Sequence, residues 1–234
     1  MPLVSVIMPV VNEAENIVAT IKAAERQYSP EQVEIIVVDG DSTDDTCALI
    51  PPHIHVIHSP RGRGLQMNRG AAESHGDILV FCHGDSQLPN GWREAVIQAL
   101  DNPAVSGGTF QTRILPAFGI LKWRNNWVLP PNWKIMFGDQ VQFMRSSTFD
   151  QVQGYREIPL MEDVEMSRAL DQAGTIVRID PKYRVITSSR RFQERGVLQQ
   201  SILNTINMIR YLYFGATPED IARSYRSSGE EEHI

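Results

Sequence analysis

The segment IIVVDGDSTDDT, residues 35–46, decides the fold. Four β-branched residues form a short apolar run, which is typical of a strand buried on both faces. Asp39 follows directly, then Gly40 and three more aspartates within five positions. One interpretation is a solvent-exposed turn that caps the next helix. The other is a binding site at the end of a strand, and the pattern of the flanking chain decides between the two.

Apolar runs alternate with helical patterns through the first hundred residues. We expect strands over residues 4–11, 33–38, 54–58 and 77–82, and helices capped by Asn12, started by Ser42 or Thr43, and spanning 64–76 and 91–100. This alternation with short connections predicts an α/β fold with a mostly parallel open sheet flanked by helices. Such sheets bind ligands outside the carboxyl ends of their strands. The polar segments 9–13, 39–45 and 83–86 then share one edge, which favours a binding site.

The pattern loosens after about residue 103. We expect strands over residues 105–114 and 140–144, and a helix that begins near Glu162 and ends at about residue 174. No internal repeat and no long linker occurs in the sequence. We therefore expect one α/β domain over residues 1–192, followed by a C-terminal helical extension with an acidic tail over residues 193–234.

Composition limits the class of protein. The 234 residues are 42% hydrophobic and 21% charged, as in a soluble globular protein. The net charge of −6 argues against a nucleic-acid partner. The two cysteines make no disulfide framework. We expect neither a signal peptide nor a membrane span, because the first residues lack a basic leader and no uncharged stretch reaches roughly 18 residues. We expect a cytoplasmic protein, and peripheral attachment at the inner membrane face stays open.

Carboxylates at element ends are the first candidates for chemistry. Asp39 can accept hydrogen bonds from a nucleobase or a sugar, and it can equally be a turn residue. Asp85 follows a strand and suits Mg²⁺ or Mn²⁺, with His83 as a second ligand or only a hydrogen-bonding residue. Glu162 and Asp163 begin a helix, where they can complement the helix dipole or supply a general base.

Basic residues form two further candidates. Arg61, Arg63 and Arg69 lie among glycines ahead of a helix, a plausible contact for a diphosphate. The segment matches neither a phosphate-binding Walker loop nor a dinucleotide fingerprint. Arg190 and Arg191 could neutralise a leaving diphosphate, or they could form a solvated arm.

Apolar residues recur at helical spacing over Val197–Tyr213. The residues that could line one side of this predicted helix are Val197, Leu198, Ile202, Ile206, Ile209 and Tyr213. That side could pack on the protein's own core. It could instead contact a membrane surface, a partner or a second copy of the chain.

Five motifs, in order, resemble the inverting nucleotide-sugar glycosyltransferases of family 2, which have the GT-A fold. The motifs are PVVNEAENI (9–17), VVDGDSTDDT (37–46), GRGLQMNRGA (62–71), ILVFCHGDSQLP (78–89) and MEDVEMSRAL (161–170). They resemble the family's P-x-x-N-E turn, V-V-D-D-G-S-x-D-x-T segment, G-x-x-x-A-x-N-x-G helix, D-x-D strand end and E-D helix, and the likeness spans roughly residues 3–192. Within the family, the chain looks closest to a bacterial subgroup named for radical-SAM/selenodomain association or arsenosugar biosynthesis.

The resemblance implies transfer of a sugar, with inversion, from a nucleotide-sugar to an unidentified acceptor hydroxyl. A UDP-sugar is the first candidate donor. The implied general base is Asp163, and the implied metal site is Asp85 with His83, holding Mn²⁺ or Mg²⁺. The residues implied to bind substrate are Pro9, Asn12, Glu13, Asp39, Asp41, Arg63, Gln66, Asn68, Asp139, Glu162, Arg190 and Arg191.

Two departures from the family pattern accompany these roles. His83 replaces the first aspartate of D-x-D, so metal binding would rest mainly on Asp85 and the diphosphate. The family's Q-x-x-R-W motif is reduced to Arg190-Arg191-Phe192. Two other functions remain open: a module that binds a nucleotide-sugar with little turnover, and a nucleotidyltransferase, although the latter usually carries a basic glycine-rich loop where this chain has VVNEAEN.

Overall fold

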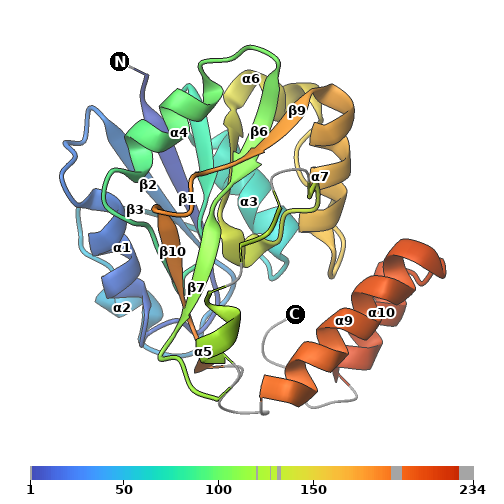
Figure 1. The fold of residues 1–234 in the computed structure, drawn as a ribbon. Helices are drawn as coiled ribbons and strands as arrows, with labels where there is room; N and C mark the ends of the chain where they lie inside the picture. The colour runs from blue at the N-terminus through green and yellow to red at the C-terminus, as the bar shows by residue number, and fades with distance from the viewer. Residues whose placement is uncertain (1, 120, 127, 131–132, 191–196, 227–234) are drawn as a thin grey trace.

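A seven-stranded sheet forms the centre of the computed structural model, which describes residues 2–119, 121–126, 128–130, 133–190 and 197–226 (Figure 1). Its strands, in spatial order, are β3 (His55–His58), β2 (Val33–Asp39), β1 (Val4–Val10), β4 (Ile78–Phe81), β8 (Gln142–Arg145), β6 (Val105–Thr109) and β9 (Thr175–Arg178). Strand β8 is antiparallel to both of its neighbours, and the other adjacent pairs are parallel. The predicted mostly parallel α/β sheet is confirmed.

Helices cover both faces of this sheet because alternate strand residues point to opposite sides. Val6 and Met8 of β1 pack in one core, and Ile7 packs in the other. The first core lies under α1 (Ile17–Glu25) and α4 (Trp92–Leu100). The second lies under α3 (Arg63–Ala72), α6 (Ser146–Gln151) and α7 (Glu162–Ala173). The continuous apolar runs of the sequence are therefore strands buried on both faces.

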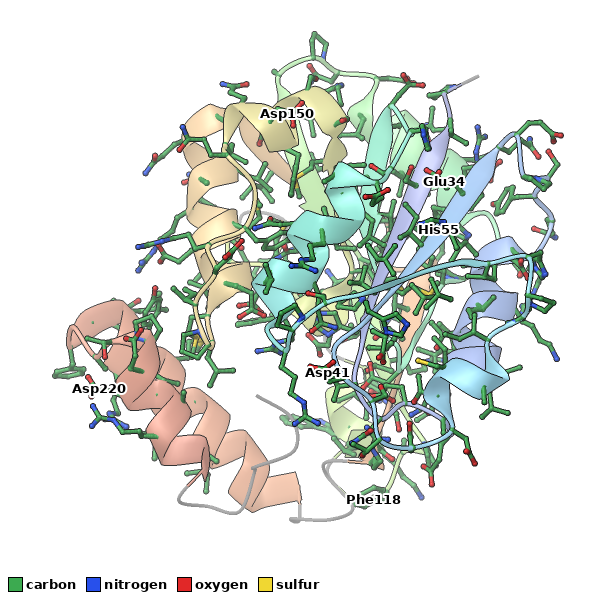
Figure 2. The ribbon with its side chains drawn as sticks, turned by 180° about the vertical axis from the view of Figure 1, so that it is seen from behind. Glu34, Asp41, His55, Phe118, Asp150 and Asp220 are labelled. Atoms are coloured by element: carbon green, nitrogen blue, oxygen red, sulfur yellow. The ribbon has the colours of Figure 1, made fainter. Side chains whose placement is uncertain are left out.

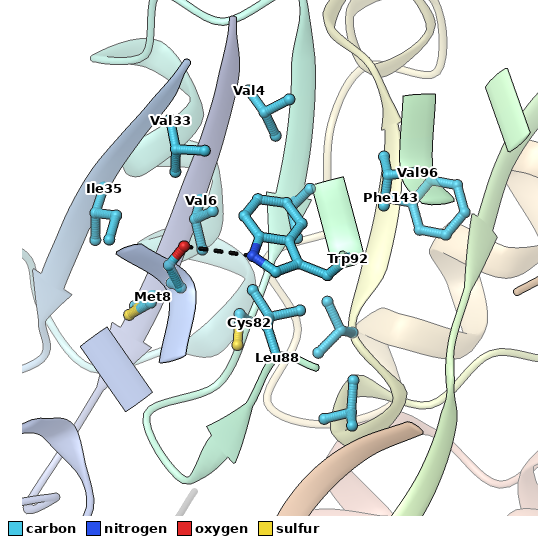
Figure 3. Packing of buried hydrophobic residues seen from close by; sticks show 14 of the residues in the cluster. Val4, Val6, Met8, Val33, Ile35, Cys82, Leu88, Trp92, Val96 and Phe143 are labelled. Atoms are coloured by element: carbon cyan, nitrogen blue, oxygen red, sulfur yellow. Dashed lines mark hydrogen bonds between the residues drawn. The ribbon is translucent and has the colours of Figure 1, made fainter. Parts of the chain in front are cut away.

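Trp92 anchors α4 on the first core. Figure 3 shows its ring among Val6, Leu88 and Val96, and its Nε1 donates to the carbonyl of Ala24, 3.3 Å away. The side chain is fully buried, so its polar atom needs that partner. This single bond ties α4 to the end of α1, the two helices that cover the same face.

A second, three-stranded sheet was not predicted. It consists of β5 (Ser86–Gln87), β10 (Arg184–Ser188) and β7 (Gln111–Leu115). The single strand expected over residues 105–114 is wrong, because the chain breaks at Phe110 into β6 of the large sheet and β7 of the small one. Phe110 is buried against Phe143, with ring centroids 5.8 Å apart. The small sheet begins one residue after Asp85 and so supports that loop.

Three predicted helix ends differ from the structure. Helix α1 begins at Ile17 with Asn16 in the cap position, so Asn12 does not cap it. Asn12 instead has a positive φ of 52°, and its Oδ1 accepts the N–H of Thr43 at 2.8 Å. The predicted helix start at Ser42 or Thr43 is also wrong, because the N–H of Thr43 is bonded to Asn12 and α2 (Thr46–Leu49) begins three residues later. Helix α3 ends at Ala72, short of the predicted end at Gly76.

The C-terminal helices form a hairpin beside α7 (Figure 1). Helix α9 (Val197–Tyr213) has the predicted bounds, and α10 (Pro218–Arg226) follows it. Ile221 and Ala222 of α10 are buried in a small cluster with Leu160. Across the described ranges, no helix has the length and apolar composition needed to cross a bilayer. The division of the chain at residue 192 stays a prediction.

Candidate active site

Three polar loops meet at the carboxyl ends of β1, β2 and β4. The strands are adjacent and parallel, with Val10 paired to Asp39 and Ile7 paired to Phe81. The predicted placement of segments 9–13, 39–45 and 83–86 on one edge is therefore confirmed. Figure 2 shows Asp41 near this end of the molecule and Asp150 at the opposite end.

Asp39 is a nearly buried carboxylate, 3% exposed, at the last position of β2. Both of its oxygens lie 3.3 Å from the N–H of Ser42, and Oδ2 lies 3.4 Å from Nδ1 of His58. Asp41 is exposed and has a positive φ of 60°, which turns the chain away from the sheet. The 39–42 turn thus holds one carboxylate inside the strand end and presents another to solvent.

Gln66 fixes the two strand ends beside this turn. Its Nε2 donates to the carbonyl of Val10 at 3.0 Å and to the carbonyl of Val38 at 2.8 Å. A Cβ at position 40 would come within 2.8 Å of the same amide, so glycine is the only residue that fits there without a shift. Gln66 is predicted to bind substrate, and in the structure its amide donates to the protein's main chain.

Asn68 makes a similar contact with the chain that leads to α7. Its Nδ2 donates to the carbonyl of Tyr155 at 2.9 Å, and its Oδ1 accepts the N–H of Tyr155 at 2.8 Å. The Asn68 amide therefore hydrogen-bonds both the main-chain carbonyl and the main-chain N–H of Tyr155. Like Gln66, it positions a loop of the site from α3, and its role as a substrate ligand stays a prediction.

The turn after β1 is joined to the end of β10. Glu13 is buried, and its Oε1 lies 2.9 Å from Nη2 of Arg190. Pro9 is buried within β1, four residues before this contact. The structure therefore brings together Glu13 and Arg190, two predicted site residues that lie far apart in the sequence. Arg191 lies outside the described residues.

The loop after β4 carries the predicted metal ligands. Oδ1 of Asp85 accepts the hydroxyl of Ser86 at 3.1 Å, and the carbonyl of Asp85 accepts the N–H of Ser188 at 3.2 Å. The ring of His83 lies against Gly138, where an added Cβ would be 2.4 Å from Cε1. These contacts fix the loop that carries both candidate ligands.

The side chains at this loop fit a cation shared with a ligand better than a closed metal site. Among the described residues, no group of three or more His, Cys, Asp or Glu side chains could hold a metal ion. One carboxylate and one imidazole would leave most coordination positions to oxygens of a bound ligand and to water, as is usual for Mg²⁺ at phosphate sites.

Asp163 is oriented by two main-chain N–H groups at the start of α7. Its Oδ2 accepts the N–H of Gly138 at 2.9 Å, and its Oδ1 accepts the N–H of Val164 at 2.7 Å. Asp139 follows Gly138 in the short 3₁₀ turn η1 (Gly138–Gln140) and is half-buried. One pocket joins this carboxylate to the β4 loop, and its lining residues are Met67, Phe81, His83, Gly138, Gln142, Tyr155, Glu162 and Asp163.

Glu162 is a buried carboxyl beside that pocket. It is 1% exposed, its Oε1 lies 2.9 Å from Nε of Arg63, and its Oε2 accepts no hydrogen bond from the described residues. Burial raises the pKa of Glu162 to about 7, although Arg63 opposes the rise. Burial also raises the pKa of Asp163, again against Arg63. The single guanidinium of Arg63 therefore offsets only part of the cost of burying the negative charge of these two adjacent carboxyl groups.

Glu162→Gln should make the free energy of unfolding less dependent on pH. In the wild type, the unfolded state ionises this carboxyl near pH 4.5 and the folded state holds the proton to about pH 7. Stability contributed by the protonated form is thus complete below pH 4.5 and is lost as pH rises to about 7, a loss on the order of 3 kcal/mol. In urea unfolding, the free energy of unfolding of the glutamine variant should therefore increase relative to that of the wild type as pH rises from 4.5 to about 7.

The matched control for this change is Glu73→Gln, at an exposed glutamate just after α3. This variant should follow the wild type at every pH. Parallel pH profiles for Glu162→Gln and the wild type would show that the carboxyl is ionised in the folded state as readily as in water.

The sequence analysis singled out His83, Glu162 and Asp163 and missed the other five residues that line the pocket, which are Met67, Phe81, Gly138, Gln142 and Tyr155. The hydroxyl of Tyr155 donates to Oε1 of Gln142 at 2.6 Å, and Nε2 of Gln142 donates to the carbonyl of Asp163 at 3.2 Å. Gly138 supplies its main-chain N–H. A strand glutamine, a loop tyrosine and a glycine have no spacing that marks them in advance. The segment GDQVQF (138–143), which contains the predicted Asp139 together with Gly138 and Gln142, was the available signal.

Known proteins with similar sequences include glycosyltransferases. The sequence model of glycosyl transferase family 2 matches residues 5–156. Glycosyltransferase AglE of Haloferax volcanii is 32% identical over 114 residues, which are 45% of this chain and 38% of AglE. The chain thus spans well under half of that relative, and the family match ends before α7.

Two solved structures have a similar fold. S. aureus TarS 1–349 in complex with UDP-GlcNAc superposes with a TM-score of 0.63 at 15% identity, over 80% of this chain and 58% of TarS. The mannosyltransferase PcManGT from Pyrobaculum calidifontis, in complex with GDP-Man and Mn²⁺, gives a TM-score of 0.58 at 19% identity, over 80% of this chain and 56% of PcManGT. The sheet and its flanking helices have the GT-A arrangement. This chain belongs to glycosyl transferase family 2.

Proposed function

We propose that the protein transfers a sugar from a nucleotide-sugar to an acceptor hydroxyl, with inversion at the sugar carbon. One observation carries the proposal: a single pocket is lined by His83 from the β4 loop and by Asp163 from α7. Sugar transfer requires a charged leaving group to be stabilised and an alcohol to be activated. One candidate metal ligand, His83, and the candidate base, Asp163, thus line the same pocket, and Asp85 lies two residues from His83 in the β4 loop.

The donor would lie along the carboxyl ends of β1, β2 and β4. Asp39 has a nearly buried carboxylate at the end of β2, suited to accept hydrogen bonds from a base or a ribose. Arg63 and Arg190 are cations at the edges of the site, each paired with a carboxylate in the structure. Structures of similar fold contain UDP-GlcNAc or GDP-Man, so nucleoside diphosphate sugars are the proposed class, with UDP-sugars tested first.

A divalent cation would be held by Asp85, with His83 as a second ligand and the diphosphate completing the coordination. Mn²⁺ or Mg²⁺ in this position would neutralise negative charge on the leaving diphosphate. Support for the assignment comes from the fixed loop and its carboxylate, and from the Mn²⁺ bound in a structure of similar fold.

Asp163 would act as the general base. The acceptor oxygen attacks the sugar carbon opposite the diphosphate, the bond from that carbon to the diphosphate oxygen breaks, and the acceptor proton passes to Asp163. The two N–H contacts hold the carboxylate in one orientation. Burial raises the pKa of Asp163, which brings it closer to the operating pH and makes it a stronger base than an exposed aspartate.

Thermal shift with a panel of nucleoside diphosphates, nucleoside triphosphates and nucleotide-sugars, with Mn²⁺ or with chelator, tests the proposed donor class. A donor present at 100 times its Kd should stabilise the protein by about 2.7 kcal/mol. For a chain of this size, that stabilisation raises Tm by about 5–10 °C. The shift should be reduced by chelator. A response confined to nucleoside triphosphates would favour a nucleotidyltransferase, and a panel without any response would contradict the proposed donor class.

A further inference from the structure

Helix α9 faces outward with its apolar side. Ile202, Ile206 and Ile209 are 49%, 49% and 39% exposed, and Tyr213 is 78% exposed. Asn207, in contrast, is 1% exposed on the opposite side of the helix. A helix that packs only on its own domain buries its apolar side and exposes its polar side. Helix α9 half-buries Leu203, Met208 and Leu212 but leaves those four other apolar side chains exposed, so its outer side is left for a partner.

The covered side of α9 is fixed by polar contacts. The hydroxyl of Ser224 on α10 donates to Oδ1 of Asn207 at 3.0 Å. The hydroxyl of Tyr211 donates to Oε1 of Glu165 on α7 at 2.7 Å, and the guanidinium of Arg168 lies 5.4 Å from the Tyr211 ring centroid. Rotating α9 to bury its isoleucines would break these contacts. The outward orientation is therefore a property of the folded domain.

The spacing of the exposed residues identifies the kind of surface. Ile202, Ile206, Ile209 and Tyr213 follow one another at intervals of four, three and four residues. These intervals are the d-a-d-a pattern of a heptad repeat, which forms the narrow seam of a helix–helix pair. A seam of this kind is filled by the side chains of another helix.

The charge of the helix argues against a membrane as the occupant. Helices that lie on membranes carry lysines and arginines on their polar face. Helix α9 contains one charged residue, Arg210, in 17 positions. The net charge of the chain is −6, which opposes approach to an anionic bilayer. The same lack of charge along the seam suits two identical helices, because it brings no row of like charges together.

We propose that this α9 seam, made of Ile202, Ile206, Ile209 and Tyr213 and extended by the exposed Phe214, is the interface between two copies of this chain. With about 200 Å² for a whole side chain of this size, the exposed fractions correspond to about 600 Å² on each protomer. Two such surfaces bury about 1,200 Å² if they cover each other completely, which is the lower limit for a specific protein–protein interface. The α9 seam therefore reaches that limit only with Phe214 included and with all of its exposed area covered.

Sedimentation equilibrium of the full chain measures the proposed association. The wild-type mass should rise with concentration and approach twice the protomer mass at about 100 µM protomer, since an interface at the lower size limit is expected to have a Kd in the micromolar range. Ile206→Asp should be a monomer, because it would bury a charge in the seam. Ile206→Ala removes apolar surface without adding charge, and it should raise the Kd of the dimer about tenfold or more.

The control is Leu49→Asp, which makes the same change at a leucine on α2 that is 44% exposed and lies outside the seam. This variant should remain a dimer, and all variants should keep the wild-type circular dichroism spectrum because the residues are exposed. A monomeric wild type would overturn the proposal. A dimer that persists in both Ile206 variants would also overturn it, as would wild-type monomers that co-float with anionic phospholipid vesicles.

Discussion

Asp163→Asn should lower the rate of sugar transfer by about 10²–10⁴, the usual contribution of a general base. Asparagine has nearly the same shape but cannot take a proton from the acceptor. It also has one carbonyl oxygen in place of two, so it can accept from Gly138 or from Val164 but not from both. The lost hydrogen bond should reduce stability by about 1 kcal/mol, which leaves the protein folded. Donor binding should survive because it depends on the strand ends.

The measurement is single-turnover transfer, performed with a donor that the thermal-shift panel identifies. Glu162→Gln is the matched control, since it neutralises the adjacent carboxyl and leaves Asp163 able to take a proton. The control should lose far less activity. The wild-type rate should rise with pH as Asp163 loses its proton, and the asparagine variant should lack that rise. Near-normal transfer by Asp163→Asn would show that Asp163 is not the general base.

Asp85→Ala should abolish the calorimetric signal for a nucleoside diphosphate in the presence of Mn²⁺. The substitution removes the carboxylate of the β4 loop and leaves only His83 as a candidate protein ligand. Without a cation, the diphosphate would approach an edge that also carries Asp39 and Asp41. The two effects act in the same direction, because a ligand for the metal is lost and repulsion of the anion is left uncompensated.

Asp150→Ala is the control for this change. Asp150 is exposed at the end of the molecule opposite Asp41, so its removal alters the charge by the same amount away from the site (Figure 2). It should bind the nucleotide as the wild type does. Equal affinity for the wild type with Mn²⁺ and with chelator would contradict a metal role for Asp85.

The architecture was predictable because its signals are local in sequence. The run before Asp39 is buried on both faces, as its β-branched residues indicated, and the order of strands and helices specified a parallel sheet. The starts of α7 at Glu162 and α9 at Val197 were also visible as periodic apolar patterns. Periodicity could not show which side of α9 would be covered, since that depends on contacts with α7 and α10.

What could not be predicted depends on residues far apart in sequence. Gln66 binds the ends of two strands, and Asn68 binds the main chain of Tyr155, contacts that no local pattern marks. Their roles as substrate ligands stay predictions. The pair Arg63–Glu162 joins α3 to α7, so neither residue alone signals a buried ion pair. The break at Phe110 likewise follows from packing on Phe143 of another strand.

The anomeric form of the sugar released from the donor tests inverting transfer most directly. In the absence of an acceptor, water should take its place slowly, and the reaction can be followed by proton NMR with Mn²⁺ before the free sugar equilibrates. From an α-linked donor, the account predicts that the β-anomer is released first. Release of the α-anomer would contradict inversion, and a donor that binds but is never cleaved would contradict catalysis and leave a nucleotide-sugar-binding module.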